Sequence, residues 1–384
     1  MRERVLILGT TGSIGNSTLE VIKNYPEKFK VVGVSCYKNI KRLEEIIINF
    51  QPEYVWFAEE KKDLIKNFPK VKFFVGKEGL KELIFSDEID TIVIAISGIA
   101  GLYPSYLAAQ TKKRILSANK ESLVAAGELI TKTLKLHNNR IIPLDSEHNA
   151  IFNLLERIDR KYIKKIILTA SGGPFFRKKI TRETSLEDVL AHPTWKMGKY
   201  ITVNSATMIN KGFEVIEAHF LFELGYDKID VLIHPQSLTH GVLQTIDGSN
   251  FMVTSPNDMK FPITLALFYP EIPEGKFASQ IFENKKRVLE FHKVNYKKFP
   301  LLNFCYQIGE KGGLAPAVLN AANEFFVEQF IRGAIPFYRL KNYIVKAVED
   351  FLSKKTLTSS YTIEDVFDVD REVKLYCEKV LKSL

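Results

Sequence analysis

The sequence has few cysteines and no long apolar run. Its three cysteines, Cys36, Cys305 and Cys377, are far apart among 384 residues and form no CxxC pair. This scarcity argues against a disulfide framework and against a zinc site built from thiolates. No apolar run approaches the roughly 20 residues that span a bilayer, so no membrane association is expected. The start, MRERVLILGTTGSIG, lacks the apolar core and cleavage site of a signal peptide, which predicts a cytoplasmic protein.

Basic character is present without the features of a nucleic-acid-binding protein. The net charge is +9, but the lysines are scattered and there is no arginine-rich arm or zinc-finger spacing. We therefore expect no nucleic-acid partner. Anionic small molecules account for a basic surface equally well, and general solubility is the simplest alternative. The length predicts two or three domains, and we find no internal repeats or low-complexity tracts.

The N-terminal segment RVLILGTTGSIGNSTLEVI predicts a strand, a glycine-rich turn and a helix. Gly9, Gly12 and Gly15 form GxxGxxG, a variant of the dinucleotide-binding fingerprint. Glycines there let the backbone turn tightly and approach a pyrophosphate, which binds the N–H groups at the helix start. The alternative is a tight turn with only a structural role.

The second predicted strand lacks the acid that usually binds the ribose of NAD. No Asp or Glu occurs from Phe29 through Leu43. The polar residues there are instead Lys38, Asn39, Lys41 and Arg42. A basic cluster at this position suits the additional phosphate of NADP. The alternative is a solvated helix start.

Short apolar runs such as DTIVIAISG, RILSANK and RIIPL alternate with helical segments as far as residue 145. This alternation predicts an open parallel sheet, in which ligands bind beyond the carboxyl ends of the strands. The polar residues at those ends lie at 9–15, 38, 97–101, 119–121 and 145–147.

The stretch PLDSEHNAIF follows a predicted strand with two acids in quick succession. In extended chain, Asp145 and Glu147 project to one face, and like charges so close repel unless a cation or a proton joins them. Magnesium and manganese prefer carboxylate oxygen, so the pair is a candidate metal site. The alternative is a helix cap, a common role of Asp and Ser.

A third ligand is expected in NSATMINKGFEVIEAHFLFEL, which has helical spacing from Lys211 onward. Its predicted core stripe is Phe213, Ile216, Phe220 and Leu224. At about 100° per residue, Asn210, Lys211 and Glu214 share one flank beside this stripe, where they could bind a metal and a phosphorylated substrate. Glu217 lies nearer the stripe, as a supporting partner of the site or a structural ion pair.

Two polar loops could hold a phosphate. Ser171 with Gly172 and Gly173 in LTASGGPFF can form an anion nest, and Ser205, Asn210 and Lys211 could bind the same anion. A third loop, AHPTWKMGKY, carries His192, Trp195, Met197 and Gly198. Its tryptophan is either part of a lid that closes over substrate or a packed side chain, and the residues alone favour packing.

The remaining chain predicts a β-hairpin followed by helices. VLIHPQSLTHGVLQTIDGSNFMVTS reads as strand, Asp-Gly turn and strand, and the pattern is helical from about Gly275, with Thr362 and Asp365 as a cap. The expected fold is α/β, with a Rossmann-like dinucleotide-binding domain (1–145), a central α+β catalytic domain with a mostly antiparallel sheet (146–275), and a C-terminal α-helical domain (276–384).

The motifs together resemble one enzyme family. GTTGSIG, SANKES, PLDSEHNAIF, TASGGPF, HPTWKMGKYITVNSATMINKGFEVIEAHFLF, IHPQSLTHG and SPNDMKFPI occur in the order of 1-deoxy-D-xylulose 5-phosphate reductoisomerase, over nearly the whole chain. The resemblance implies conversion of that phosphorylated sugar to 2-C-methyl-D-erythritol 4-phosphate in non-mevalonate isoprenoid biosynthesis. It also implies NADPH and a divalent cation (Mg²⁺, Mn²⁺ or Co²⁺) as cofactors, and a homodimer built with the second sheet.

The resemblance also implies roles for single residues. The implied metal ligands are Asp145, Glu147 and Glu214. The implied catalytic residues are Lys120, Glu147, His192, Trp195 and Met197, the last two in a mobile loop. The implied substrate contacts are Ser146, Glu147, Ser171, His192, Ser205, Asn210, Lys211 and Glu214. The implied NADPH contacts are Thr11, Gly12, Ser13, Ile14, Lys38, Asn39, Asn119, Glu121, Gly198 and Met259. Ser237 and His240 are expected on a strand beside the site.

One residue departs from the family pattern. The family often has glycine before the Lys-Asn pair, where this chain has Tyr37, which bears on packing around adenosine but not on the NADP preference. Two alternatives remain to be weighed. One is another NADP oxidoreductase, such as a semialdehyde or homoserine dehydrogenase, of which the semialdehyde dehydrogenase would need an activated cysteine. The other is a non-catalytic NADP(H) sensor, which would bind without metal-dependent turnover.

Overall fold

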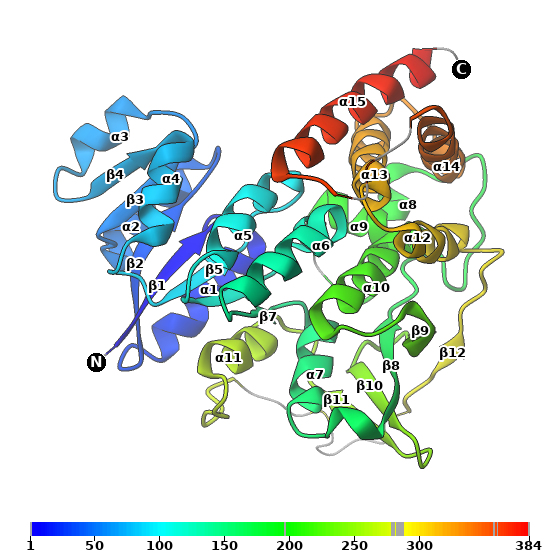
Figure 1. The fold of residues 1–384 in the computed structure, drawn as a ribbon, viewed down its shortest axis with the longest axis horizontal. Helices are drawn as coiled ribbons and strands as arrows, with labels where there is room; N and C mark the ends of the chain where they lie inside the picture. Colours follow the sequence, from blue (N-terminus) through cyan, green and yellow to red (C-terminus); the bar gives the residue numbers. More distant parts are fainter. Residues whose placement is uncertain are drawn as a thin grey trace. The chain divides into compact units, whose positions relative to one another are not determined.

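A computed structural model of the chain describes residues 2–195, 197–277, 281, 288–355, 358 and 360–382 (Figure 1). The chain divides into two compact units. Unit 1 comprises Met1–Asn119, Ile130–Asn149 and Asp258–Ala278, and unit 2 comprises Lys120–Leu129, Ala150–Asn257 and Ser279–Leu384. The three-part division at residues 145 and 275 stays a prediction.

Unit 1 contains the predicted parallel sheet. Its described strands are β1 (Glu3–Leu8), β2 (Phe29–Ser35), β3 (Tyr54–Phe57), β4 (Lys72–Val75), β5 (Thr91–Ile94), β6 (Arg114–Ser117) and β7 (Ile141–Pro143). They pair in parallel in the order β4-β3-β2-β1-β5-β6-β7. The sheet grows in one direction from β1 to β4 and in the other from β5 to β7. The carboxyl ends of β1 and β5 therefore form the topological switch point, where such sheets bind ligands.

The helices that lie wholly within unit 1 follow its strands, with the exception of α11. They are α1 (Ser13–Asn24), α2 (Ile40–Phe50), α3 (Lys62–Asn67), α4 (Gly76–Phe85), α5 (Leu102–Ala109, after a 3₁₀ turn at Ile99–Gly101) and α11 (Lys260–Phe268). Although α11 is distant in sequence, it packs against α1. The Phe268 ring meets Tyr25 and Phe29 edge to face, with centroids 4.8 and 5.1 Å apart. Helix α11 thus adds apolar packing at the end of α1 and at the start of β2.

Helices α6 (Lys120–Leu136) and α7 (Ser146–Leu155) each pass from one unit to the other along the chain. Helix α6 is kinked at Ala126, whose φ of −141° and ψ of 31° are not helical. Next to the kink, a Cβ on Gly127 would lie 2.1 Å from Cδ2 of Phe220, so the close approach requires glycine.

Unit 2 contains the second sheet. Its described strands are β8 (Ile163–Ala170), β9 (Ile229–Ile233), β10 (Thr239–Thr245), β11 (Asn250–Thr254) and β12 (His292–Lys293), in the order β11-β10-β8-β9-β12. Strand β10 is antiparallel to β8 and β11, β12 is antiparallel to β9, and β8 is parallel to β9. The predicted hairpin is confirmed as β10 and β11, with the Asp247 carboxylate accepting a hydrogen bond from Ser249 N in the turn.

Helices make up the rest of unit 2. They are α8 (Leu186–Leu190), α9 (Lys199–Thr207), α10 (Ile209–Phe222), α12 (Pro300–Lys311), α13 (Ala315–Ile331), α14 (Phe337–Lys354) and α15 (Ile363–Lys382), with 3₁₀ turns at Arg160–Tyr162 and Tyr226–Lys228. Helix α13 packs against α14 and α15 (Figure 1). Thr362 and Asp365 cap α15 reciprocally, as predicted. No helix in the described part of the chain has the length and apolar character that a bilayer crossing requires.

The predicted onset of helical structure near Gly275 is wrong. The described residues between Tyr269 and Phe299 form β12 and irregular segments, and the next helix begins at Pro300. Proline at the first helical position has no N–H to leave unsatisfied and a backbone angle that suits the helix, so it marks a helix start.

Candidate functional site

The glycine-rich turn of unit 1 has the backbone geometry that a dinucleotide site needs. Gly9 has a φ of 89°, and a Cβ there would lie 2.5 Å from the carbonyl oxygen of Ala95, which follows β5. A Cβ on Gly15 would lie 2.5 Å from the oxygen of Gly9. Gly12 and Ser13 are exposed where α1 begins, and the first turn of α1 contains no acid. Its N–H groups are therefore suited to a pyrophosphate.

The basic segment after β2 also begins a helix. Asn39 caps α2 by accepting a hydrogen bond from Arg42 N (3.1 Å). The Arg42 guanidinium donates from Nε and Nη2 to Asn16 Oδ1 (3.0 and 2.7 Å), and its Nη1 pairs with Glu45. Lys38 is exposed. The segment therefore does begin a helix, which was the predicted alternative to a site for the NADP phosphate. The same segment also presents the exposed ammonium of Lys38 after the end of β2.

The other predicted NADPH contacts differ in their surroundings. Asn119 is buried and donates from Nδ2 to the backbone oxygens of Ile96 and Gly98, both at 2.9 Å, so it shapes the loop after β5. Glu121 is buried in unit 2, where burial and the Glu324 carboxylate raise its pKa to about 7. The Glu121 side chain is therefore part of the interior of unit 2.

Glu217 is a second buried acid whose charge acts on Glu121. It is buried on α10, and its negative charge also contributes to raising the pKa of Glu121. Met259, another predicted NADPH contact, immediately precedes α11 and belongs to unit 1, the unit of the glycine-rich turn.

The acids of PLDSEHNAIF do not lie in extended chain. Helix α7 begins at Ser146, so the predicted strand-like projection of Asp145 and Glu147 is wrong. Asp145 Oδ1 accepts hydrogen bonds from Glu147 N (3.1 Å) and His148 N (3.4 Å), which makes Asp145 the cap of α7. Ser146 Oγ donates to Glu147 Oε2 at 2.5 Å. Both acids lie at a helix N-terminus, where the partial positive charge of the backbone favours negative groups.

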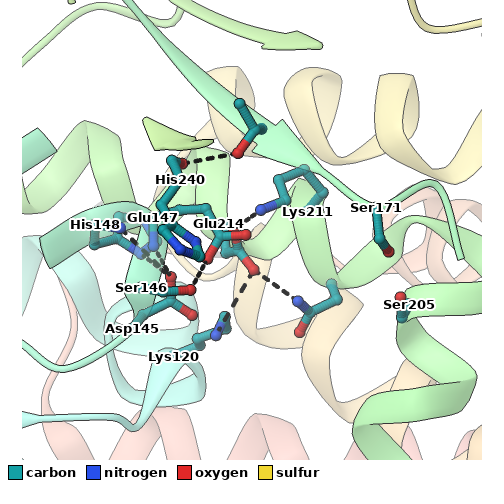
Figure 2. Close-up of polar contacts among 12 residues, drawn as sticks. Lys120, Asp145, Ser146, Glu147, His148, Ser171, Ser205, Lys211, Glu214 and His240 are labelled. Carbon is teal, nitrogen blue, oxygen red and sulfur yellow. Dashed lines mark hydrogen bonds and ion pairs between the residues drawn. The ribbon is translucent and has the colours of Figure 1, made fainter. Parts of the chain in front are cut away.

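His148 is a candidate site residue that the sequence analysis did not select. It is fully buried, and its Nδ1 lies 3.2 Å from Asp145 Oδ1 (Figure 2). The available signal was its position three residues after a capping acid, which places it on the same side of the helix. Asp145, His148 and Glu214 each offer an atom of a kind that binds metal ions.

Glu214 is the centre of a charged cluster in unit 2. It is buried on α10, and its carboxylate accepts hydrogen bonds from Asn210 Nδ2 (2.6 Å) and from Lys211 Nζ. Lys120 Nζ lies 3.7 Å from Glu214 Oε1 (Figure 2). The predicted shared flank of residues 210, 211 and 214 is therefore observed. Of the predicted core stripe, Phe213 and Ile216 are buried, Phe220 is half-buried, and Leu224 lies beyond the helix end.

The two predicted phosphate-binding serines share a histidine. His192 Nε2 lies 3.0 Å from Ser171 Oγ and 3.1 Å from Ser205 Oγ. Gly172 and Gly173 have φ values of 79° and 62°, so the backbone after Ser171 curls in the manner of an anion nest. A Cβ on Gly173 would lie 2.9 Å from the oxygen of Ser205. Serines from two separate segments are thereby brought to one place.

His192 has a defined hydrogen-bonding state. Its Nδ1 accepts from the backbone N–H groups of Thr194 (3.3 Å) and Trp195 (3.0 Å). Burial lowers its pKa to about 4, so the ring is neutral near pH 7. An Nδ1 that accepts requires the proton on Nε2, which then donates to a serine hydroxyl. His192 therefore links the serine pair to the loop that carries Trp195.

That loop also contacts the segment before β10. Thr194 Oγ1 lies 3.3 Å from Ser237 Oγ, and the Trp195 and His240 ring centroids are 6.2 Å apart. Ser237 precedes β10 and has a φ of 52°, so its expected place on a strand is wrong, whereas His240 is on β10. Lys196 lies outside the described residues. Movement of this loop stays a prediction.

Two further predicted site residues lie in the same loop. Met197 is half-buried, whereas Gly198 is exposed and occupies the N-cap position of α9.

The cysteines do not form an activated nucleophile. Burial raises the pKa of the Cys36 thiol to about 11 and that of Cys377 to about 12, and it also raises the pKa of Cys305. A thiol with a raised pKa is not the nucleophile that a semialdehyde dehydrogenase requires.

Comparisons with known proteins give one family along the chain. A model of 1-deoxy-D-xylulose 5-phosphate reductoisomerase matches residues 5–127, and models of its C-terminal domains match residues 141–222 and 254–376. The reductoisomerase of Thermodesulfovibrio yellowstonii is 43% identical over 382 residues, covering 98% of this chain and 99% of the relative. That of Leptospira interrogans is 40% identical, covering 97% of this chain and 95% of the relative.

Solved structures agree with these matches. A crystal structure of DOX-P reductoisomerase in complex with NADPH, fosmidomycin and magnesium superposes with a TM-score of 0.91 at 34% identity, covering 99% of this chain and 98% of that one. The Zymomonas mobilis enzyme in complex with NADPH gives 0.91 at 33% identity, covering both chains fully. Since sequence and fold agree over nearly the full length, this chain belongs to the 1-deoxy-D-xylulose 5-phosphate reductoisomerase family.

Proposed function

We propose that this chain rearranges 1-deoxy-D-xylulose 5-phosphate and reduces the product with NADPH to 2-C-methyl-D-erythritol 4-phosphate, in the presence of a divalent cation. The observation that carries the proposal is the full-length similarity to reductoisomerases, including one solved with NADPH and magnesium at a TM-score of 0.91. The reaction belongs to non-mevalonate isoprenoid biosynthesis.

The NADPH site is assigned mainly to unit 1. Residues 11–14 would hold the pyrophosphate with backbone N–H groups at the start of α1, and Lys38 with Asn39 would bind the adenosine ribose and its 2′-phosphate. Asn119 shapes the loop at the switch point through its two backbone contacts. Glu121, Gly198 and Met259 complete the proposed set. NADPH supplies the hydride for the reduction.

Asp145, Glu147 and Glu214 would hold the cation. All three offer carboxylate oxygen, the donor that Mg²⁺ and Mn²⁺ prefer, so the donor chemistry fits a hard cation. Only 2% of the surface of Glu214 is exposed, and its side chain accepts hydrogen bonds from Asn210 and Lys211. When bound, the cation acts as a Lewis acid on oxygens of the substrate.

The substrate phosphate is assigned to Ser171, Ser205, Asn210 and Lys211. The hydroxyls already share His192 Nε2, and Gly172 and Gly173 curl the adjacent backbone. Binding energy from this remote group can be used to orient the reacting carbons. Lys120 adds positive charge beside Glu214, and Ser146 is the remaining proposed contact. Trp195 and Met197 would exclude water during reduction.

Absorbance of NADPH, followed with 1-deoxy-D-xylulose 5-phosphate and Mg²⁺, tests the proposal. We expect consumption that stops when excess chelator is added and resumes with excess Mg²⁺. Glu214→Gln should lower turnover by about 100-fold or more, because the cation would lose one of three charged ligands, while NADPH binding is retained. Glu223→Gln, at the exposed end of the same helix, is the matched control and should be unaffected.

Consumption that survives chelation would point to a simple reductase and would remove the cation from these carboxylates. A folded protein that binds NADPH but consumes none with this substrate would act as a sensor or on another substrate.

We also propose a cytoplasmic homodimer that uses the second sheet. Support for the dimer comes from strand β11 at the edge of that sheet, where Phe251 and Met252 are 46% and 44% exposed, and from the adjacent Ile246, which is 63% exposed. An edge strand with exposed apolar side chains can pair with another chain. Light scattering should give a dimer mass, and Phe251→Glu should convert it to a monomer. The location is supported by the three free, buried cysteines.

A further inference from the structure

Tyr37, between β2 and α2, is an aromatic residue at the surface of the molecule. Its side chain is 71% exposed, the largest exposed fraction among the described aromatic side chains. We propose that the Tyr37 ring stacks on the adenine of NADPH and so makes this chain's adenosine site an aromatic one. The inference rests on the proposed NADPH-dependent function and concerns a residue at which the chain departs from the family pattern.

The position of Tyr37 follows from how β2 ends. Ser35 Oγ accepts a hydrogen bond from Gly9 N (2.8 Å), and Ser35 O accepts one from Thr10 N (2.9 Å). These bonds join the end of β2 to the glycine-rich turn. In dinucleotide-binding folds the adenosine runs from the helix that follows this turn to the end of the second strand. Tyr37 is two residues beyond Ser35, where the adenine is expected.

Charge at the same place suits a nucleotide with a 2′-phosphate. Lys38 Nζ lies 5.0 Å from the centroid of the Tyr37 ring, and within the described residues Lys38 forms no ion pair. Arg42, in the first turn of α2, already donates to Asn16 and pairs with Glu45. The exposed ammonium of Lys38 is therefore available to bind a phosphate, and the exposed ring of Tyr37 beside it is available to stack on a base.

Stacking is the interaction that this geometry favours. A ring with most of its surface in solvent has an open face, and every purine has a π-face to cover it. Stacking of a base on an aromatic side chain typically contributes about 1–3 kcal/mol, measured by alanine substitution, which corresponds to a change in affinity of about 5- to 150-fold. The bound adenine would also bury apolar ring surface.

Affinity measurements on the full chain test the inference. NADPH binding is followed by the fluorescence of the cofactor, and 2′,5′-ADP, which lacks nicotinamide, is titrated by calorimetry to isolate the adenosine half. We expect Tyr37→Ala to lower the affinity for both ligands by about 5- to 150-fold. The affinity of Tyr37→Phe should stay within about twofold of that of the natural chain, because phenylalanine keeps the ring. Tyr162→Ala, which removes another exposed tyrosine in unit 2, is the control and should bind normally.

Three outcomes would overturn the inference. Unchanged affinity of Tyr37→Ala for both ligands would show that the ring makes no contact with the nucleotide. Equal losses in Tyr37→Phe and Tyr37→Ala would assign the effect to the hydroxyl and not to stacking. Absence of NADPH binding by the natural chain would instead refute the proposed function itself, and the stacking inference with it.

Discussion

Substitution of Gly212 tests how strictly the position of Glu214, a proposed cation ligand, depends on the packing of α10. It lies on α10 between Lys211 and Phe213, two residues before Glu214. A Cβ at Gly212 would lie 2.3 Å from Sγ and 2.5 Å from Cβ of Cys305, a fully buried residue of α12. Ordinary contact between such atoms begins near 3.5 Å, so in Gly212→Ala the two helices must separate by about 1 Å.

The magnitude follows from two opposing effects. Alanine for glycine in a helix interior is worth about 1 kcal/mol of stability, whereas overpacking a well-packed core costs about 1–3 kcal/mol. We therefore expect a net loss of at most about 2 kcal/mol in the free energy of unfolding. A displacement of about 1 Å at reacting groups can cost about 100-fold in rate, so turnover should fall by about that factor as Lys211 and Glu214 move with α10.

Thermal unfolding and NADPH consumption measure the two effects separately. Gly275→Ala is the control, because a Cβ there meets nothing within 4 Å. Cys305→Gly removes the atoms that the new methyl group strikes, so the double variant should regain part of the turnover that Gly212→Ala loses. Wild-type stability and turnover in Gly212→Ala would refute the reasoning, as would a double variant no more active than Gly212→Ala.

Three further predictions concern single contacts. Thr362→Ala removes the cap of α15 and should lower the free energy of unfolding by about 1 kcal/mol, seen in denaturant titration, whereas Thr362→Ser should not. Because the pKa of His192 is lowered to about 4 from an unfolded value near 6.5, the unfolded chain takes up the proton first. His192 thus destabilises the fold as pH falls from about 6.5 to 4, and His192→Gln should flatten the decline of the unfolding midpoint across that window; an unchanged slope would contradict this. Glu290→Ala removes contacts to Gln236 and Arg177 and should raise hydrogen exchange around Ser237 by roughly tenfold or more, while exchange in β1 stays unchanged.

Local patterns predicted the parts of the molecule that local physics determines. Continuous apolar runs alternating with helical segments predicted the parallel sheet of unit 1, because strands buried on both faces have no polar alternation. Helical spacing placed Asn210, Lys211 and Glu214 on one flank, since three or four residues complete a turn. The hairpin followed from its Asp-Gly turn.

The errors arose where one signal has two physical readings. Asp and Ser are both ligands and helix caps, so the sequence around Asp145 could not separate an extended metal site from the first turn of α7. The burial of Glu121 and His148 depends on elements distant in sequence, which periodicity does not report. The return of α11 to unit 1 has the same origin.

The packing of α11 in unit 1 affects when that unit can finish folding during synthesis of the chain. The strands of unit 1 are complete at Pro143, but Phe268, which packs on Tyr25 and Phe29, follows only after more than a hundred further residues. Domains generally fold as units as they leave the ribosome, and incomplete ones expose apolar surface that aggregates. A nascent chain that has not yet reached Lys260 therefore presents one open face of α1 to the cell, and this interval is when chaperones have the most to recognise.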